Sequence, residues 1–204
     1  MSRSVRWSLL TMTGLAAGVL MALVLGEPIE AVVGMILVTP ALTLLVGAVL
    51  GTSQWLDVRH RVTRSRAWIP ATCLGLGAGL ALGAVIVELT GRFLTGEQLS
   101  IVRLGVGTRA LSLLVLGVTA GLCMGAAQWL AVLRRHGSPA SRWIGVSALA
   151  LGFAFSASSL LVDALLGGLK SPVGVVALLL LTGLLFGAGT ARALPKANGN
   201  VLPS

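Results

Sequence analysis

Six long apolar runs dominate this sequence, and they restrict the folds open to it more than any other feature. A helix crosses the hydrocarbon core of a bilayer with roughly 20 residues, and each run reaches that length. The runs are Trp7–Gly26, Ala31–Leu56, Trp68–Leu89, Thr108–Leu133, Trp143–Leu165 and Pro172–Leu194. Pro40 lies inside the second run, where a proline kinks or breaks a helix. The runs predict an all-α, six-helix integral membrane bundle that forms a single membrane domain over residues 1–204.

The composition excludes an ordinary soluble domain. Of the 204 residues, 56% are hydrophobic and 10% are charged, whereas soluble domains average about 25% charged residues. The formal net charge of +9 raises the question of nucleic-acid binding. The basic residues, however, stand in short clusters between apolar runs, which is typical of cytoplasmic loops. We therefore expect the lipid bilayer as a partner and no nucleic acid.

The distribution of basic residues predicts the orientation. One side would hold the N-terminus, the loops after the second and fourth runs, and the C-terminus. Its basic residues are Arg3, Arg6, Arg59, Arg61, Arg64, Arg66, Arg134, Arg135, Arg142, Arg192 and Lys196, against Arg92, Arg103, Arg109 and Lys170 on the other side. Loops rich in Lys and Arg stay in the cytoplasm. We therefore expect a multi-pass protein of the inner cell membrane with both termini in the cytoplasm.

An internal repeat groups the runs into hairpins. The segment Gly51-Thr-Ser-Gln54-Trp55-Leu56 recurs as Gly125-Ala-Ala-Gln128-Trp129-Leu130, and basic residues follow both copies. The first, third and fifth runs open with Trp7, Trp68 and Trp143. Each of these tryptophans is followed by small residues after seven and eleven positions, and by an acid after twenty. The last run departs from the pattern, with Thr190 and Ala191 in place of Gln and Trp.

These offsets predict three repeated transmembrane hairpins in a pseudo-three-fold arrangement. The repeat units cover about residues 1–59, 60–135 and 136–204, and the middle one carries an outer insertion at residues 91–103. The small residues share one stripe on each odd-numbered run, because offsets of seven and eleven return to nearly the same direction on a helix. Such stripes favour close packing of helices in lipid, and a narrow pore lined by glycine is the alternative.

Two sets of repeated side chains are candidates for anchoring and polar contacts. Tryptophan prefers the headgroup level, so we expect interfacial anchors at Trp7, Trp55, Trp68, Trp129 and Trp143. Gln54 and Gln128 lie one turn inside that level, and an amide can both donate and accept hydrogen bonds. They form either a hydrogen-bonded clamp between hairpins or a polar pair that faces a shared central cavity.

The repeated acids Glu27, Glu88 and Asp163 lie near the outer boundary. They are either solvated residues that end their helices or a three-fold acidic ring at an outer mouth, which would attract cations. Arg109, near the outer start of the fourth run, is placed to pair with one of them.

No pattern in the sequence indicates catalysis or a bound cofactor. Phosphate-binding loops, dinucleotide fingerprints, His-Glu-x-x-His and nucleophile elbows are all missing. Cys73 and Cys123 lie inside apolar runs at a spacing that matches no metal motif, and both histidines, His60 and His136, lie in basic loops. We therefore expect no catalytic residues, no metal and no cofactor, and we expect that the protein is not an enzyme.

Through its repeated Gly-x-x-Gln-Trp-Leu element, the chain resembles a family of uncharacterised bacterial multi-pass membrane proteins built from such hairpins. In this sequence arginines follow the element and a tryptophan then opens the next helix, most clearly at residues 51–68 and 125–143. The resemblance would cover most of the chain. It implies the repeated-hairpin architecture and no activity.

Two functions remain open from the sequence. The first is a non-enzymatic structural or accessory subunit of a larger membrane assembly, with other membrane proteins as partners. A nearly uncharged interior and many glycines suited to helix packing favour it. The alternative is a small-solute or ion transporter or channel with a path along the repeat axis. Pro40, Gln54, Gln128 and the outer acids favour that alternative.

Overall fold

The structure is a computed structural model, and it describes residues 2–33, 35–62, 64–95, 105–136, 140–166 and 172–194. Over these residues the chain forms six α-helices and two short 3₁₀ helices. They are α1 (Arg3–Val33), α2 (Met35–Val58), η1 (Ser65–Ala67), α3 (Trp68–Thr95), α4 (Val106–Ala131), η2 (Leu133–His136), α5 (Ala140–Leu166) and α6 (Pro172–Ala191). The predicted all-α class and the six predicted helices are confirmed over the described part of the chain. All six are long and apolar enough to cross a membrane.

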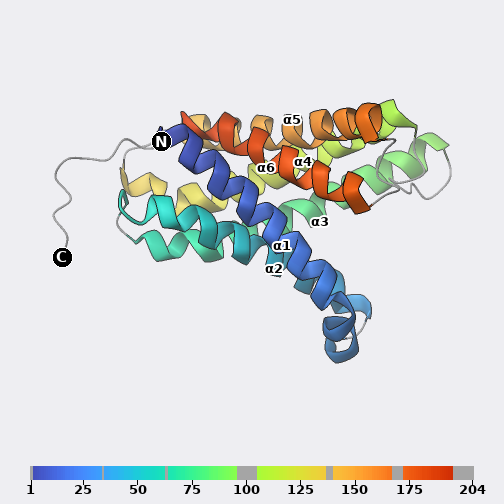
Figure 1. Cartoon of the computed structure of the whole chain (residues 1–204), viewed down its shortest axis with the longest axis horizontal. Helices are drawn as coiled ribbons and strands as arrows, with labels where there is room; N and C mark the ends of the chain where they lie inside the picture. The colour runs from blue at the N-terminus through green and yellow to red at the C-terminus, as the bar shows by residue number, and fades with distance from the viewer. Residues whose placement is uncertain are drawn as a thin grey trace.

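The helices form a closed ring in chain order. Each helix packs against its neighbours in the sequence, and α6 packs against α1 to close the ring (Figure 1). Antiparallel neighbours joined by short connections are the usual topology of helix bundles. Of the insertion predicted at residues 91–103, α3 includes residues 91–95, and residues 96–104 lie outside the described part of the chain.

Glycines allow the helix backbones to come close together at the seams of the ring. A Cβ atom added to Gly79 would lie 2.5 Å from the Cα of Ala120 on α4, and one on Gly183 would lie 2.6 Å from the Cα of Met12 on α1. Lipid tails are as apolar as the helices, so close packing rather than the exclusion of water must stabilise such a bundle in a membrane. The glycines at these seams therefore serve helix packing.

The hairpin of α1 and α2 diverges from the rest of the ring. Figure 1 shows that the ends of α1 and α2 remote from the N-terminus lie apart from α3 to α6. We call this part the α1–α2 arm: residues 20–30 of α1 and 39–42 of α2. Pro28 lies inside α1 and Pro40 inside α2. A proline removes a backbone hydrogen bond and bends the helix. The helix α2 continues through Pro40, so the sequence-based alternative of a break there is wrong.

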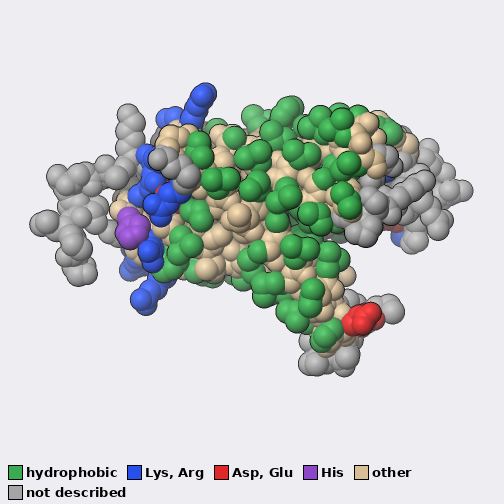
Figure 2. Space-filling view, viewed as in Figure 1, with side chains coloured by type: hydrophobic (Ala, Val, Ile, Leu, Met, Phe, Trp, Pro, Cys, Tyr) green, Lys and Arg blue, Asp and Glu red, His purple; other side chains and the backbone are tan. Residues whose placement is uncertain are grey.

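The surface is divided by chemistry along the bundle. Figure 2 shows that arginine side chains gather at the end that holds the N-terminus, which we call the basic end. Hydrophobic side chains cover the middle of this face. Large apolar residues of α5, such as Leu149 and Phe153, are exposed. A helix that is apolar on its outer as well as its inner face is typical of a membrane span.

Candidate functional site

Three buried tryptophans meet near the basic end. Trp7, Trp68 and Trp143 start α1, α3 and α5, and none is more than 2% exposed. The ring centroids of Trp7 and Trp68 lie 6.2 Å apart, and those of Trp68 and Trp143 lie 5.7 Å apart, in edge-to-face geometry. Because α1, α3 and α5 are not neighbours in the ring, these contacts cross its interior.

The predicted interfacial anchors are therefore wrong for Trp7, Trp68 and Trp143. An indole has an apolar body and one N–H, so it suits either the headgroup level or a core that contains a hydrogen-bond acceptor. These three indoles belong to a core cluster that also contains Val58 and Leu133.

Each indole N–H donates to a polar side chain of the adjacent even-numbered helix. Nε1 of Trp68 lies 3.2 Å from Oε1 of Gln54, and Nε1 of Trp143 lies 3.2 Å from Oε1 of Gln128. At the seam that closes the ring, Nε1 of Trp7 donates to Oγ1 of Thr190 at 2.9 Å. The same donor and acceptor arrangement therefore occurs at three seams, α2–α3, α4–α5 and α6–α1.

Both glutamines also donate in the opposite direction around the ring. Nε2 of Gln54 lies 3.4 Å from Oγ1 of Thr11 on α1, and Nε2 of Gln128 lies 2.9 Å from Oγ1 of Thr72 on α3. Each buried amide thus joins the preceding helix to the following one. This geometry is the one expected for a hydrogen-bonded clamp between hairpins. The amide oxygen and the amide nitrogen are both engaged, whereas a polar pair that faces a central cavity would leave them free.

Within the described residues, the corresponding hydrogen bond from α6 back to α5 is missing. Thr11, Thr72 and Ser147 each lie four residues after their tryptophan, but α6 carries Thr190 at the position that Gln54 and Gln128 occupy in the other two repeats. Thr190 has a shorter side chain than glutamine, and its hydroxyl donates to the carbonyl of Phe186 at 2.9 Å. Within the described residues, the buried Oγ of Ser147 has no hydrogen-bond partner.

Thr190→Gln should therefore stabilise the protein. The new amide would accept from the indole of Trp7 and donate to Ser147, as Gln54 and Gln128 do at their seams. We expect the free energy of unfolding to rise by about 0.6 kcal/mol, the mean for a hydrogen bond between membrane helices. Unfolding in detergent measures it, and Ser147→Ala supplies the control background. An equal gain in that background would show that the stabilisation does not come from Ser147.

The predicted ring of acids does not form. Asp163 of α5 pairs with Arg109 of α4, so the predicted pairing of Arg109 with one of these acids is confirmed. Glu88 pairs with Arg92 on its own helix at 2.7 Å. Glu27 belongs to the α1–α2 arm, and Figure 2 shows acidic side chains at the tip of this arm, away from the bundle. Glu27 is carried away from the bundle by the arm, and the other two acids are each paired with an arginine. The three acids therefore do not surround a common opening.

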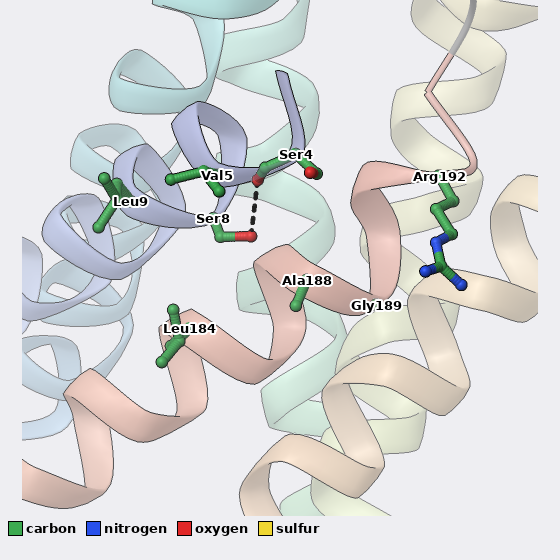
Figure 3. Close-up of a pocket in the computed structure, with 8 residues that line it drawn as sticks. All are labelled: Ser4, Val5, Ser8, Leu9, Leu184, Ala188, Gly189 and Arg192. Carbon is green, nitrogen blue, oxygen red and sulfur yellow. Dashed lines mark hydrogen bonds between the residues drawn. The ribbon is translucent and has the colours of Figure 1, made fainter. Parts of the chain in front are cut away.

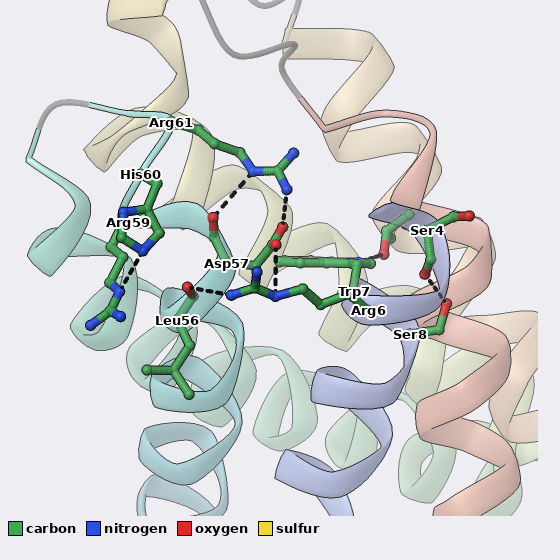
Figure 4. Close-up of polar contacts among 10 residues, drawn as sticks. Ser4, Arg6, Trp7, Ser8, Leu56, Asp57, Arg59, His60 and Arg61 are labelled. Atoms are coloured by element: carbon green, nitrogen blue, oxygen red, sulfur yellow. Dashed lines mark hydrogen bonds and ion pairs between the residues drawn. The ribbon is translucent and has the colours of Figure 1, made fainter. Parts of the chain in front are cut away.

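Sequence analysis missed a buried carboxylate at the basic end. Asp57 of α2 is almost completely buried, and its two oxygens lie 2.7 Å from Nη2 of Arg61 and 3.5 Å from Nε of Arg6 (Figure 4). Nη2 of Arg6 also donates to the carbonyl of Leu56 at 3.4 Å. These contacts tie the start of α1 to the end of α2. Asp57 has no counterpart in the second hairpin, where Ala131 follows Trp129 by two residues, so the repeat did not reveal it. Its position two residues before the arginine cluster that starts at Arg59 was the available signal.

The other two tryptophans lie at the surface of the basic end and are partly buried. Nε1 of Trp55 donates to Oγ of Ser65 at 3.2 Å, and the guanidinium of Arg59 lies 5.4 Å from the ring centroid of Trp55. A cation over an indole face is a favourable contact. The interfacial-anchor role stays a prediction for Trp55 and Trp129.

Titratable side chains do not form a metal centre in the described part of the chain, where His, Cys, Asp and Glu nowhere gather in a group of three. Cys73 and Cys123 are free thiols. No family model, curated protein or solved structure matches this chain.

Proposed function

We propose that this chain is a multi-pass protein of the bacterial inner membrane with three repeated hairpins and cytoplasmic termini. We further propose that it is a non-enzymatic structural or accessory subunit of a larger membrane assembly. Six apolar helices of spanning length and the cluster of arginines at the basic end support the membrane topology. The recurring contact between a tryptophan and a polar side chain at three seams supports the repeat.

The observation that carries the proposal of a subunit is an apolar cleft beside the α1–α2 arm. The cleft has a volume of about 540 Å³ and lies between α2 and α3, with Leu116 of α4 at its base. Thr39 and Thr43 line it from α2, but the hydroxyl of Thr43 donates to the carbonyl of Thr39 at 2.8 Å. The occupant of such a cleft is therefore apolar.

The corresponding position of the next hairpin is filled by a helix of the chain itself. Under the proposed repeat, Gly117 of α4 corresponds to Thr43 of α2, since each lies eleven residues before its glutamine. A Cβ atom on Gly117 would lie 2.7 Å from the Cα of Gly152 on α5, so those two backbones touch.

At the cleft the equivalent contact is loose. Gly77, the counterpart of Gly152, meets α2 only through the tips of Leu44 and Thr43, at 3.4 and 4.0 Å from an added Cβ. Gly77, Ala81 and Ala84 of α3 line the cleft, and all three are small residues. Small side chains are what membrane helices use to pack against one another. A transmembrane helix of a partner subunit is the occupant that fits this cleft best.

A path along the repeat axis has weaker support. The three indoles fill the interior near the basic end, and both glutamines are engaged in protein hydrogen bonds. A conducting path needs polar groups that remain available to a solute. The buried polar groups near the tryptophans favour a structural role.

Site-specific photocrosslinking in native membranes tests the proposal. Leu74 in the cleft and Leu149 on α5 are 64% and 71% exposed, and each lies six residues after its tryptophan, so they form a matched pair. A photoreactive side chain at position 74 should capture one membrane protein that also co-purifies in stoichiometric amount, whereas position 149 should capture lipid. Equal products at both positions, or crosslinks only to lipid or to a second copy of this chain, would contradict the accessory-subunit proposal.

A further inference from the structure

A second groove runs along the seam where α6 closes the ring against α1 (Figure 3). Its volume is about 480 Å³. Val5 and Leu9 line it from α1, and Leu184 and Ala188 line it from α6, so its floor is apolar. Leu9 and Leu184 are both exposed along this seam. The floor belongs to the helix segments that are apolar enough to lie in a membrane.

One end of the groove is positively charged. Arg192 follows the last residue of α6 and lines the groove at the basic end of the bundle. Nη2 of Arg142 donates to the carbonyl of Arg192 at 3.4 Å, which places a second guanidinium beside the same turn. Neither arginine forms an ion pair with a carboxylate of the described residues.

The other polar groups near the groove do not neutralise the guanidinium of Arg192. The hydroxyl of Ser8 donates to the carbonyl of Ser4 at 2.8 Å, as Figure 3 shows. Asp57, the nearest acid along the basic end of α1 and α2, is already paired with Arg6 and Arg61. The groove therefore combines an apolar length with a cationic end that has no carboxylate partner among the described residues.

We propose that this groove binds an anionic phospholipid, with an acyl chain along the floor and the headgroup phosphate at Arg192. Arginine presents a planar fork of donors that matches phosphate oxygens. Basic residues at the end of membrane helices bind anionic headgroups, and the apolar floor continues in the direction that an acyl chain takes. The cleft beside the α1–α2 arm has no basic residue in its lining, so it lacks this match. The inference rests on the proposed membrane location and not on the proposed partner subunit.

Native mass spectrometry of the full chain tests the site. Protein in detergent is exchanged into equimolar phosphatidylglycerol and phosphatidylcholine with identical acyl chains, and the retained lipid is counted. The wild type should retain phosphatidylglycerol in preference. Arg192→Gln should reduce that preference about five-fold, the effect expected for one basic residue near a membrane surface. The control is Arg135→Gln, which removes the same charge from the exposed end of η2, an element that packs against α4 and is not part of the groove lining.

A second variant separates the floor from the charge. Ala188 is exposed in the groove, so Ala188→Phe would fill the floor without disturbing a packed seam. It should reduce retention of both lipids at this site. Equal retention of the two lipids by the wild type, or equal losses for Arg192→Gln and Arg135→Gln, would overturn the proposal. Displacement of the lipid by inorganic phosphate alone would also overturn it, because the acyl chain would then contribute nothing. The crosslink from position 74 is a separate readout, so loss of the lipid site leaves the proposal of a partner subunit standing.

Discussion

Trp68→Ala should lower the free energy of unfolding by about 3–5 kcal/mol, the range measured for deletion of a fully buried large aromatic side chain. Trp68 lies between the indoles of Trp7 and Trp143 and contacts both. In lipid the helices are held together mainly by packing contacts. The cavity that Trp68→Ala creates would remove such contacts, and nothing would replace them. The substitution also leaves Oε1 of Gln54 without its indole donor. Unfolding of the purified protein in mixed micelles measures the change.

Two variants show whether the loss comes from burial. Trp55→Ala removes the same atoms from a partly buried tryptophan at the same end of the bundle, and we expect it to cost far less. Trp68→Phe keeps most of the ring and removes the N–H, so it should cost about 0.6 kcal/mol for the hydrogen bond plus a small packing loss. If Trp55→Ala and Trp68→Ala destabilise the protein equally, Trp68 is not buried between Trp7 and Trp143 as described.

Arg109→Ala should destabilise the protein by about 3 kcal/mol. Removal of one partner of a buried ion pair leaves the other charge without compensation, which is costly in an apolar environment. The side chains of Arg109 and Asp163 are each 9% exposed. The pair joins α4 to α5 at the end of the bundle opposite the tryptophans. Unfolding under the same conditions as for Trp68 measures the loss.

The chain contains a matched exposed pair as the control. The side chains of Arg92 and Glu88 are 54% and 32% exposed, so Arg92→Ala should cost at most about 1 kcal/mol. Replacing both Arg109 and Asp163 with leucine should recover most of the stability, because no unpaired charge then remains buried. A loss for Arg109→Ala that does not exceed the loss for Arg92→Ala would show that water reaches Asp163.

The candidate polar residues could be selected from the sequence, but their partners could not. The repeat identified Gln54 and Gln128, and their buried contacts fit the clamp between hairpins. It also identified Trp7, Trp68 and Trp143 but placed them at the membrane surface. An indole satisfies its N–H equally with a headgroup or with a buried acceptor, and a local pattern does not distinguish the two. Asp57 was missed because it breaks the repeat instead of following it.

The sequence by itself determined the class of the protein: all-α, with six helices of spanning length and one basic end. These properties are local, because the length of an apolar run and the spacing of charges along the chain suffice to predict them. Only the tertiary structure decided which side chains meet. The contact between Trp7 and Thr190 joins residues 183 positions apart, and the pair of Arg109 and Asp163 joins residues 54 apart. Glu27, Glu88 and Asp163 each lie twenty residues after a tryptophan, which predicted that they lie together. The divergence of the α1–α2 arm separates Glu27 from the other two. Contacts between residues so far apart in the sequence depend on how the helices close into a ring. Helical periodicity indicates only which face of its own helix a residue occupies.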